Sequence, residues 1–187
     1  MNIRKSLPYF LCMALLVVGL SSFTTIREDD KKDDLRTTWA NTKAYVLAIA
    51  EAMPEDQYGF KPTDEIRDFA GQLKHISFSI YFLPGVFVEG KNIKFDPEYP
   101  SKPELVGGTK AEIIALLEQR FDAIDELLAK ATDKQLDESI VIPFMDNKKT
   151  TKGDLMTWLN KHTGHHSSQA IIYLRMNGIT PPAYNGW

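Results

Sequence analysis

The sequence predicts an all-α protein, a four-helix bundle that follows an N-terminal signal peptide. Four long segments repeat apolar residues at alternating spacings of four and three, the pattern of a helix that buries one face. No alternation of apolar and polar residues extends beyond a few positions, which argues against a sheet-based domain. Long connectors follow the first three segments, so a simple up-and-down order of the helices is not implied.

The N-terminus has the layout of a secretory signal. Arg4 and Lys5 precede an apolar run at 7–20 that is too short for a comfortable membrane span, and small residues follow it. We assign residues 1–24 to a signal peptide, 25–34 to a charged tether and 35–187 to the helical domain. Export to the periplasm is expected; the alternative is a retained segment that anchors the chain to a membrane.

Charge and cysteine content exclude several classes. The formal net charge of −3 becomes −5 without the signal, which carries two basic and no acidic residues, so nucleic acid is not an expected partner. The single cysteine, Cys12, lies inside the apolar run. The mature chain therefore has no disulfide, thiolate ligand or cysteine nucleophile, and its roughly 160 residues are enough for one domain with its own core.

The first two helices are predicted over 35–53 and 68–83, because Pro54 and Pro84 follow them and proline cannot donate the next backbone hydrogen bond. The first has one apolar stripe, whereas the second is apolar on two faces. The stripe of the first is Leu35, Trp39, Thr42, Val46, Ile49 and Met53. The two faces of the second are Phe69, Leu73, Ile76, Ile80 and Leu83, and His75, Phe78, Ser79 and Phe82.

A connector rich in glycine and proline, 85–108, is expected to lie over one end of the bundle and to help wall a pocket. The third helix begins with a capping box at Thr109 and Glu112 and continues to Ala131. Residues 134–150 are expected to be irregular, with a short extended piece at 140–144 against the bundle.

The final helix is predicted over 151–177, with Thr151 as its N-cap and Gly178 ending it in a left-handed turn. Its buried seam contains histidine at two positions where a bundle ordinarily has leucine. The seam is Leu155, Leu159, His162, His166, Gln169, Tyr173 and Met176. Two imidazoles four residues apart point the same way, which is how a helix presents two nitrogen ligands to a transition metal.

His75, on the second helix, is the third candidate ligand. Each of the three histidines is alternatively a packing residue hydrogen-bonded to a carbonyl. An unpaired buried polar group costs roughly 1–3 kcal/mol, and one shared cation would satisfy all three. We therefore predict a site for one divalent transition metal, zinc or nickel, held by His75, His162 and His166 with a position open to water.

The spacing excludes two other kinds of metal site. A di-iron carboxylate bundle has glutamate three residues before its histidine, where this chain has Gln72 and Leu159. A zinc peptidase helix has glutamate directly after its first histidine, where this chain has Thr163.

Gln169 and His165 are candidates for supporting the ligands rather than coordinating the ion. Gln169 is one turn beyond His166, where it can bond a ligand imidazole or, equally, another helix. His165 is about 60° to one side of His162, so one ion cannot easily take both together with His166. The alternative interpretation is that His165 is an exposed side chain without a role.

Two blocks of the sequence, 53–76 and 159–184, resemble the DinB-like domain family of metalloenzymes in content and spacing. The resemblance runs over essentially the whole mature domain. It implies a four-helix bundle in which one histidine of the second helix and an H-x-x-x-H pair of the fourth hold a divalent metal. These match His75, His162 and His166. The family's usual H-H-R-G-Q is H-H-S-S-Q here, so Ser167 and Ser168 replace arginine and glycine.

The resemblance also implies an activity class. Relatives are described as metal-dependent hydrolases, and characterised members include thiol S-transferases and isomerases; dimers are frequent. We therefore expect an exported metalloprotein that acts on a small molecule by metal-dependent hydrolysis or thiol transfer, and the resemblance makes a homodimer one expected assembly. The alternative is a non-catalytic protein that binds a metal or is stapled by one. No acidic residue lies on the seam beside the histidines, so the sequence identifies no general base.

Overall fold

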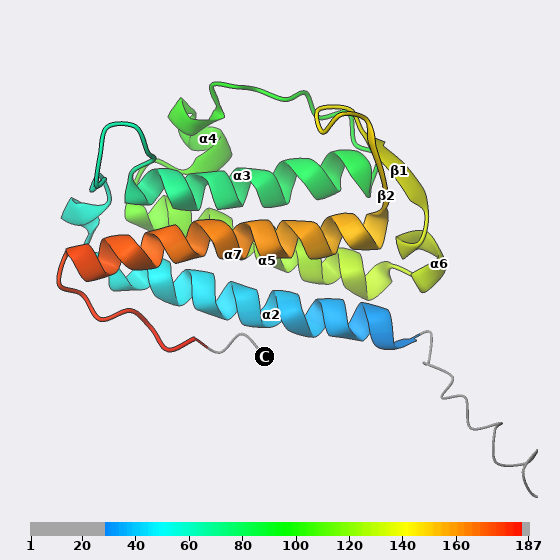
Figure 1. The fold of residues 1–187 in the computed structure, drawn as a ribbon, viewed down its shortest axis with the longest axis horizontal. Coiled ribbons are helices and arrows are strands. Elements are labelled where there is room, and N and C mark those ends of the chain that lie inside the picture. The colour runs from blue at the N-terminus through cyan, green and yellow to red at the C-terminus, as the bar shows by residue number, and fades with distance from the viewer. Residues whose placement is uncertain (1–28, 185–187) are drawn as a thin grey trace, which may run out of the picture.

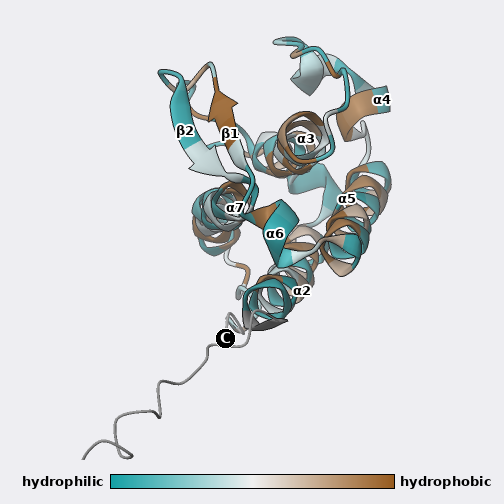
Figure 2. Ribbon diagram, turned by 90° about the vertical axis from the view of Figure 1, so that its right-hand side faces the viewer, coloured by the Kyte–Doolittle hydropathy of each residue, from teal (hydrophilic) through white to brown (hydrophobic). Residues whose placement is uncertain are grey.

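The computed structural model describes residues 29–184, and its core is a bundle of four long helices (Figure 1). These are α2 (Asp29–Ala52), α3 (Phe69–Phe87), α5 (Lys110–Lys130) and α7 (Lys152–Met176). Each helix contacts two others, in the cyclic order α2, α5, α3, α7. The end-on view of Figure 2 shows the four helices around a common interior, with α3 the most apolar of them. The predicted fold class is confirmed.

The apolar stripes predicted from the sequence form the core. All five predicted positions of α5 are buried, as are both faces of α3 apart from the half-buried His75. In α2 only Thr42 of the predicted stripe is half-buried. In α7, His162 and Gln169 of the predicted seam are half-buried, and Met176 has 56% of its surface exposed because it lies in the last turn of that helix.

The chain does not run up and down through the bundle. α3 and α5 run in the same direction, as do α2 and α7, which Figure 1 shows through the colour gradient. A parallel pair requires a connection that returns along the bundle, and residues 88–109 make it. This crossover segment contains the short helices η2 (Tyr99–Ser101) and α4 (Pro103–Val106).

The crossover segment lies along α3 rather than over one end of the bundle, which corrects the expected placement. Tyr99 stacks on Phe78 of α3 with ring centroids 3.9 Å apart, and Phe95 contacts Phe78 and Phe82 edge-on. The second apolar face of α3 is therefore covered by this segment.

Two predicted boundaries are wrong. Residues 29–34, expected in the tether, form the start of α2, where acidic residues near a helix N-terminus are favourable and Lys31 pairs with Asp137 at 2.7 Å. α3 continues through Pro84 to Phe87. The proline costs one hydrogen bond to an earlier turn, but its own carbonyl accepts from Val88 and Glu89, and both Pro84 and Gly85 are buried.

The segment before α7 has more structure than predicted. It contains helix α6 (Asp133–Leu136) and an antiparallel hairpin of β1 (Ser139–Ile142) and β2 (Lys148–Thr151), paired in the register Ser139 with Thr151. Its turn places Asp146 and Asn147 at positive φ, which asparagine and aspartate tolerate. The extended piece expected at 140–144 is thus one strand of a pair.

The predicted helix termini are confirmed. Thr109 and Glu112 form the capping box of α5, the Thr151 side chain caps α7, and Gly178 ends α7 at a φ of 71°. None of the helices between residues 29 and 184 combines the length and apolar character that a membrane crossing requires. The predicted signal peptide, 1–24, lies outside the described residues.

Gly107, where the crossover segment meets α5, gives a test of this fold. Its φ is 81°, and a Cβ there would lie 2.7 Å from the Ile113 nitrogen. We predict that Gly107→Ala lowers the free energy of unfolding by roughly 1–3 kcal/mol in urea denaturation. Gly59→Ala is the control, since nothing lies within 4 Å of its added Cβ. Equal stability of the two variants would contradict the described backbone.

Candidate metal centre

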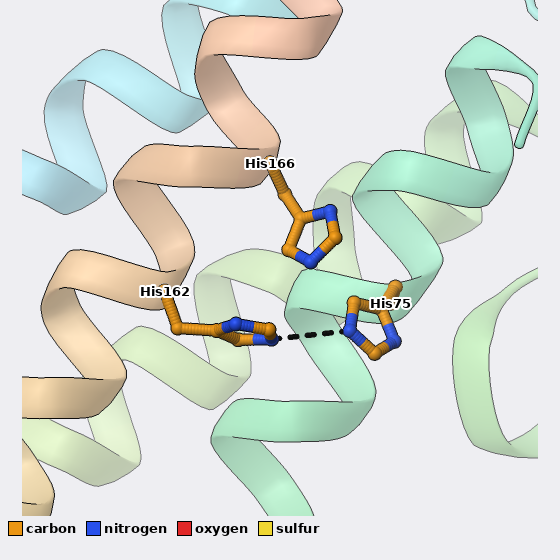
Figure 3. Close-up of side chains that lie close together, drawn as sticks. All are labelled: His75, His162 and His166. Atoms are coloured by element: carbon orange, nitrogen blue, oxygen red, sulfur yellow. Dashed lines mark hydrogen bonds between the residues drawn. The ribbon is translucent and has the colours of Figure 1, made fainter. Parts of the chain in front are cut away.

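The structure brings together the three histidines that the sequence singled out. His75 comes from α3, and His162 and His166 come from successive turns of α7, which runs antiparallel to it (Figure 3). One ring nitrogen from each of the three lies within 4.8 Å of the others. No other group of three or more histidine, cysteine, aspartate or glutamate side chains in the described part of the chain meets this condition.

The rings are close enough to interact directly. His75 Nε2 and His162 Nε2 are 3.1 Å apart, the dashed line of Figure 3. The centroid of the His75 ring lies 4.4 Å from that of His166 and 5.2 Å from that of His162. Two facing Nε2 atoms can share only one proton, and a cation that accepts both lone pairs would replace it.

A hydrogen-bond network sets which nitrogen of His166 is free. Both amide hydrogens of Gln72 are used, because its Nε2 donates to Gln169 Oε1 at 2.7 Å and to the Tyr173 hydroxyl at 3.2 Å. The Gln72 Oε1 therefore accepts from His166 Nδ1, at 2.7 Å, which leaves a lone pair on His166 Nε2. Tyr173 completes the network by donating to the Arg67 carbonyl at 3.0 Å.

The other two imidazoles are also held from outside the cluster. The His75 Nδ1 is 2.5 Å from the hydroxyl of Tyr99, a buried residue of the crossover segment. The His162 ring stacks on Trp158, one turn earlier in α7, with centroids 5.0 Å apart and planes 11° from parallel. Each ring thus has a partner that fixes its orientation, as preorganised ligands of a metal do.

Burial keeps the three histidines neutral. Loss of solvent lowers the pKa of His75 to about 4 and that of His166 to about 3, and it lowers the pKa of His162 as well. After burial, neighbouring histidines and the positive charge of Arg67 lower all three pKa values further, and Arg67 is the smallest of these causes for His166. Neutral imidazoles with free Nε2 atoms are the form that binds divalent transition metals, so the residues present fit such an ion.

Gln169 and His165 lie beside the group of three histidines without belonging to it. Gln169 bonds Gln72 across the helix pair, and its own Nε2 lies 2.8 Å from the exposed His165 Nε2. Gln169 is therefore two hydrogen bonds from His166, through Gln72, whereas the His165 ring contacts the His166 ring edge-on, with centroids 5.0 Å apart. Ser167 and Ser168 donate back to the carbonyls of Thr163 and Gly164 in α7 rather than toward the histidines.

Comparison with known proteins identifies the family. The sequence profile of the DinB superfamily matches residues 35–170. This chain belongs to the DinB superfamily. Among curated proteins it is similar to the uncharacterised protein YjoA of Bacillus subtilis (strain 168), with 24% identity over 132 residues, or 71% of this chain and 81% of YjoA.

Solved structures of DinB-like proteins share the fold. YjoA of B. subtilis has a TM-score of 0.63 at 22% identity, and the match covers 81% of this chain and 97% of the YjoA chain. A DinB-like protein from Bacillus cereus ATCC 10987 has a TM-score of 0.64 at 18% identity, and the match covers 81% of this chain and 95% of the B. cereus chain. YfiT from B. subtilis is described as a probable metal-dependent hydrolase with an unusual four-helix bundle topology. It has a TM-score of 0.62 at 18% identity, and the match covers 83% of this chain and 91% of the YfiT chain.

Three residues of this DinB-superfamily site were not predicted as site residues from the sequence. In the sequence, Gln72 stands where a di-iron centre would have glutamate, and a glutamine among buried, mostly apolar residues is itself a signal of a polar partner. Tyr99 contacts His75 only because the crossover segment returns along α3. Arg67 lies in the connector that precedes α3. No spacing rule relates either of them to the histidines.

The lowered pKa values predict how the stability of the metal-free DinB-superfamily protein depends on pH. Below the ordinary histidine pKa of 6.5 the unfolded chain takes up protons that folded His75 and His166 refuse until about pH 4 and 3. The free energy of unfolding should therefore be highest above pH 6.5 and fall as the pH falls toward 4. The limiting slope is about 1.4 kcal/mol per pH unit for each histidine.

Urea denaturation of the protein after a chelator has removed any metal, at several pH values between 7.5 and 4.5, measures this dependence. His166→Gln removes one of the histidines with a lowered pKa and should make the slope shallower. An unchanged slope in that variant would show that His166 titrates normally in the folded protein.

Proposed function

We propose that this DinB-superfamily protein binds one divalent transition metal, zinc or nickel, through His75, His162 and His166. We propose further that it uses the ion to act on a small molecule, by hydrolysis or by thiol S-transfer. The observation that carries the proposal is the convergence of three imidazole nitrogens within 4.8 Å from two helices. YfiT, which shares the fold, is described as a probable metal-dependent hydrolase, which supports the hydrolytic form.

The donor set suits activation of a ligand better than simple storage of an ion. When bound, a divalent metal held by three neutral imidazoles would act as a Lewis acid that lowers the pKa of water from about 16 to roughly 7, or activates a thiol in the same way. The contribution of the chain is to keep its ligands fixed. Gln72 holds His166 through Nδ1, Tyr99 holds His75 through Nδ1, and Trp158 stacks on His162.

A non-catalytic, metal-stapled bundle is the second candidate, and one observation favours it. His166 is only 5% exposed, and the cluster joins α3 to α7 in the same region as the buried Gln72. An ion there would cross-link two helices whatever else it does.

We also propose that the protein is exported. The proposal is supported by the charged and apolar pattern of residues 4–20, which lies outside the described residues, and by the absence of cysteine from position 13 onward. A periplasmic small molecule is then the expected substrate.

Removal of one proposed ligand tests the metal site. We predict that wild-type protein without an affinity tag, reconstituted with Zn²⁺ or Ni²⁺, contains one ion per chain by elemental analysis. His162→Ala should lose it, because two imidazoles remain. His165→Ala is the matched control, since it removes an exposed imidazole three residues away and should keep the ion. Full metal content in His162→Ala would exclude this residue as a ligand.

Removal of the metal separates the two candidate functions. We predict that the chelated protein keeps its helical circular dichroism and a cooperative thermal transition, because all four helices contribute to an apolar core apart from the histidines. It should lose any esterase or thiol-transfer activity found in a substrate panel and regain it with Zn²⁺ or Ni²⁺. Loss of the cooperative transition on chelation would instead favour the metal staple.

A further inference from the structure

Arg67, in the connector just before α3, is held beside the histidine cluster. Its carbonyl accepts from the Tyr173 hydroxyl, which belongs to the network that orients His166. Its side chain runs along Gly71: a Cβ on that glycine would lie 3.2 Å from Arg67 Cβ and 3.7 Å from Arg67 Cγ. Gly71 is one turn before His75 on the same face of α3, so the arginine stem lies one helical turn from His75.

The Arg67 side chain is hydrogen-bonded to Tyr99, the residue whose hydroxyl contacts His75 Nδ1. Burial has the largest effect on the pKa of Tyr99 and raises it. Arg67 lowers the same pKa, through its positive charge and through a side-chain hydrogen bond. Within residues 29–184, Arg67 takes part in no ion pair. The neighbouring carboxylate, Asp68, caps α3 by accepting from the Gly71 nitrogen at 2.6 Å.

Among the described residues, no carboxylate belongs to the group that the three histidines form. After burial, the groups that lower the pKa values of the three histidines are neighbouring histidines and Arg67, and Arg67 is the one of them that carries a charge at neutral pH. Three neutral imidazoles would leave a bound divalent cation with its full charge, and the Arg67 guanidinium adds one more positive charge. The site would therefore be strongly positive in a chain whose formal net charge is −3, and such a site attracts anions.

We propose that Arg67 determines substrate specificity by binding an oxyanion of the substrate, a carboxylate or a phosphate, next to the metal site. This inference rests on the proposed function and names its substrate class: small anionic molecules. A guanidinium recognises carboxylate and phosphate oxygens through paired hydrogen bonds. Arg67 is exposed, has no ion pair within residues 29–184, and has five N–H donors, so donors remain beyond its hydrogen bond to Tyr99. Arg67 is then a residue of the binding site and not a metal ligand.

The test measures anion binding by the Co²⁺-loaded full-length protein. Visible absorption of the cobalt reports binding of three probes: inorganic phosphate, acetate and neutral imidazole. Arg67→Gln should weaken the binding of phosphate, acetate or both by at least about tenfold, and should change the imidazole and cobalt dissociation constants by no more than about twofold. The probe with the larger loss identifies which oxyanion Arg67 prefers.

Arg175→Gln is the matched control. It removes the same charge from the C-terminal turn of α7, near Tyr45 rather than the histidines, and should bind both anions as the wild type does. Anion binding within twofold of wild type in Arg67→Gln, with cobalt still bound, would overturn the inference about Arg67 alone. Failure of the wild-type protein to bind cobalt would instead overturn the proposed metal site.

Discussion

The contact between α3 and α7 has to accommodate polar side chains in an otherwise apolar interior. Gln72 and His166 are buried there, and an unpaired polar group in such a place costs roughly 1–3 kcal/mol. The structure meets the constraint with one connected set of hydrogen bonds, from His166 through Gln72 to Tyr173 and Gln169. Because each amide and hydroxyl hydrogen has one acceptor, the set also determines which nitrogen of His166 stays free. The same contacts that hold the two helices in register therefore prepare a ligand.

The parallel arrangement of α3 and α5 has a functional consequence. It requires the crossover segment, which returns along α3 and covers the aromatic face made by Phe78 and Phe82. That path brings the Tyr99 hydroxyl to His75 Nδ1. A simple up-and-down bundle with short turns would leave this imidazole without its outer partner. Topology, and not only helix packing, thus contributes to the orientation of the three rings.

Electrostatics connect the cluster to a class of ligand. Burial favours neutral histidines, and neutral ligands do not reduce the charge of a cation that they bind. Arg67 adds positive charge without an ion-pair partner in the described chain. In a protein of net negative charge, this local excess is a property of the site rather than of the surface as a whole. It favours an anionic small molecule over a neutral one.

The sequence by itself determined the four helices, their buried stripes and the three histidines, because a helix repeats every 3.6 residues and therefore fixes which side chains share a face. It also indicated that His162 and His166 point the same way. Only the tertiary structure decided that His75 meets them, since that depends on the register of α3 against α7. It also decided that Gln72, Tyr99 and Arg67 surround the cluster, and that α3 continues through Pro84. These features depend on contacts between residues far apart in the chain, and helical periodicity carries no information about such contacts.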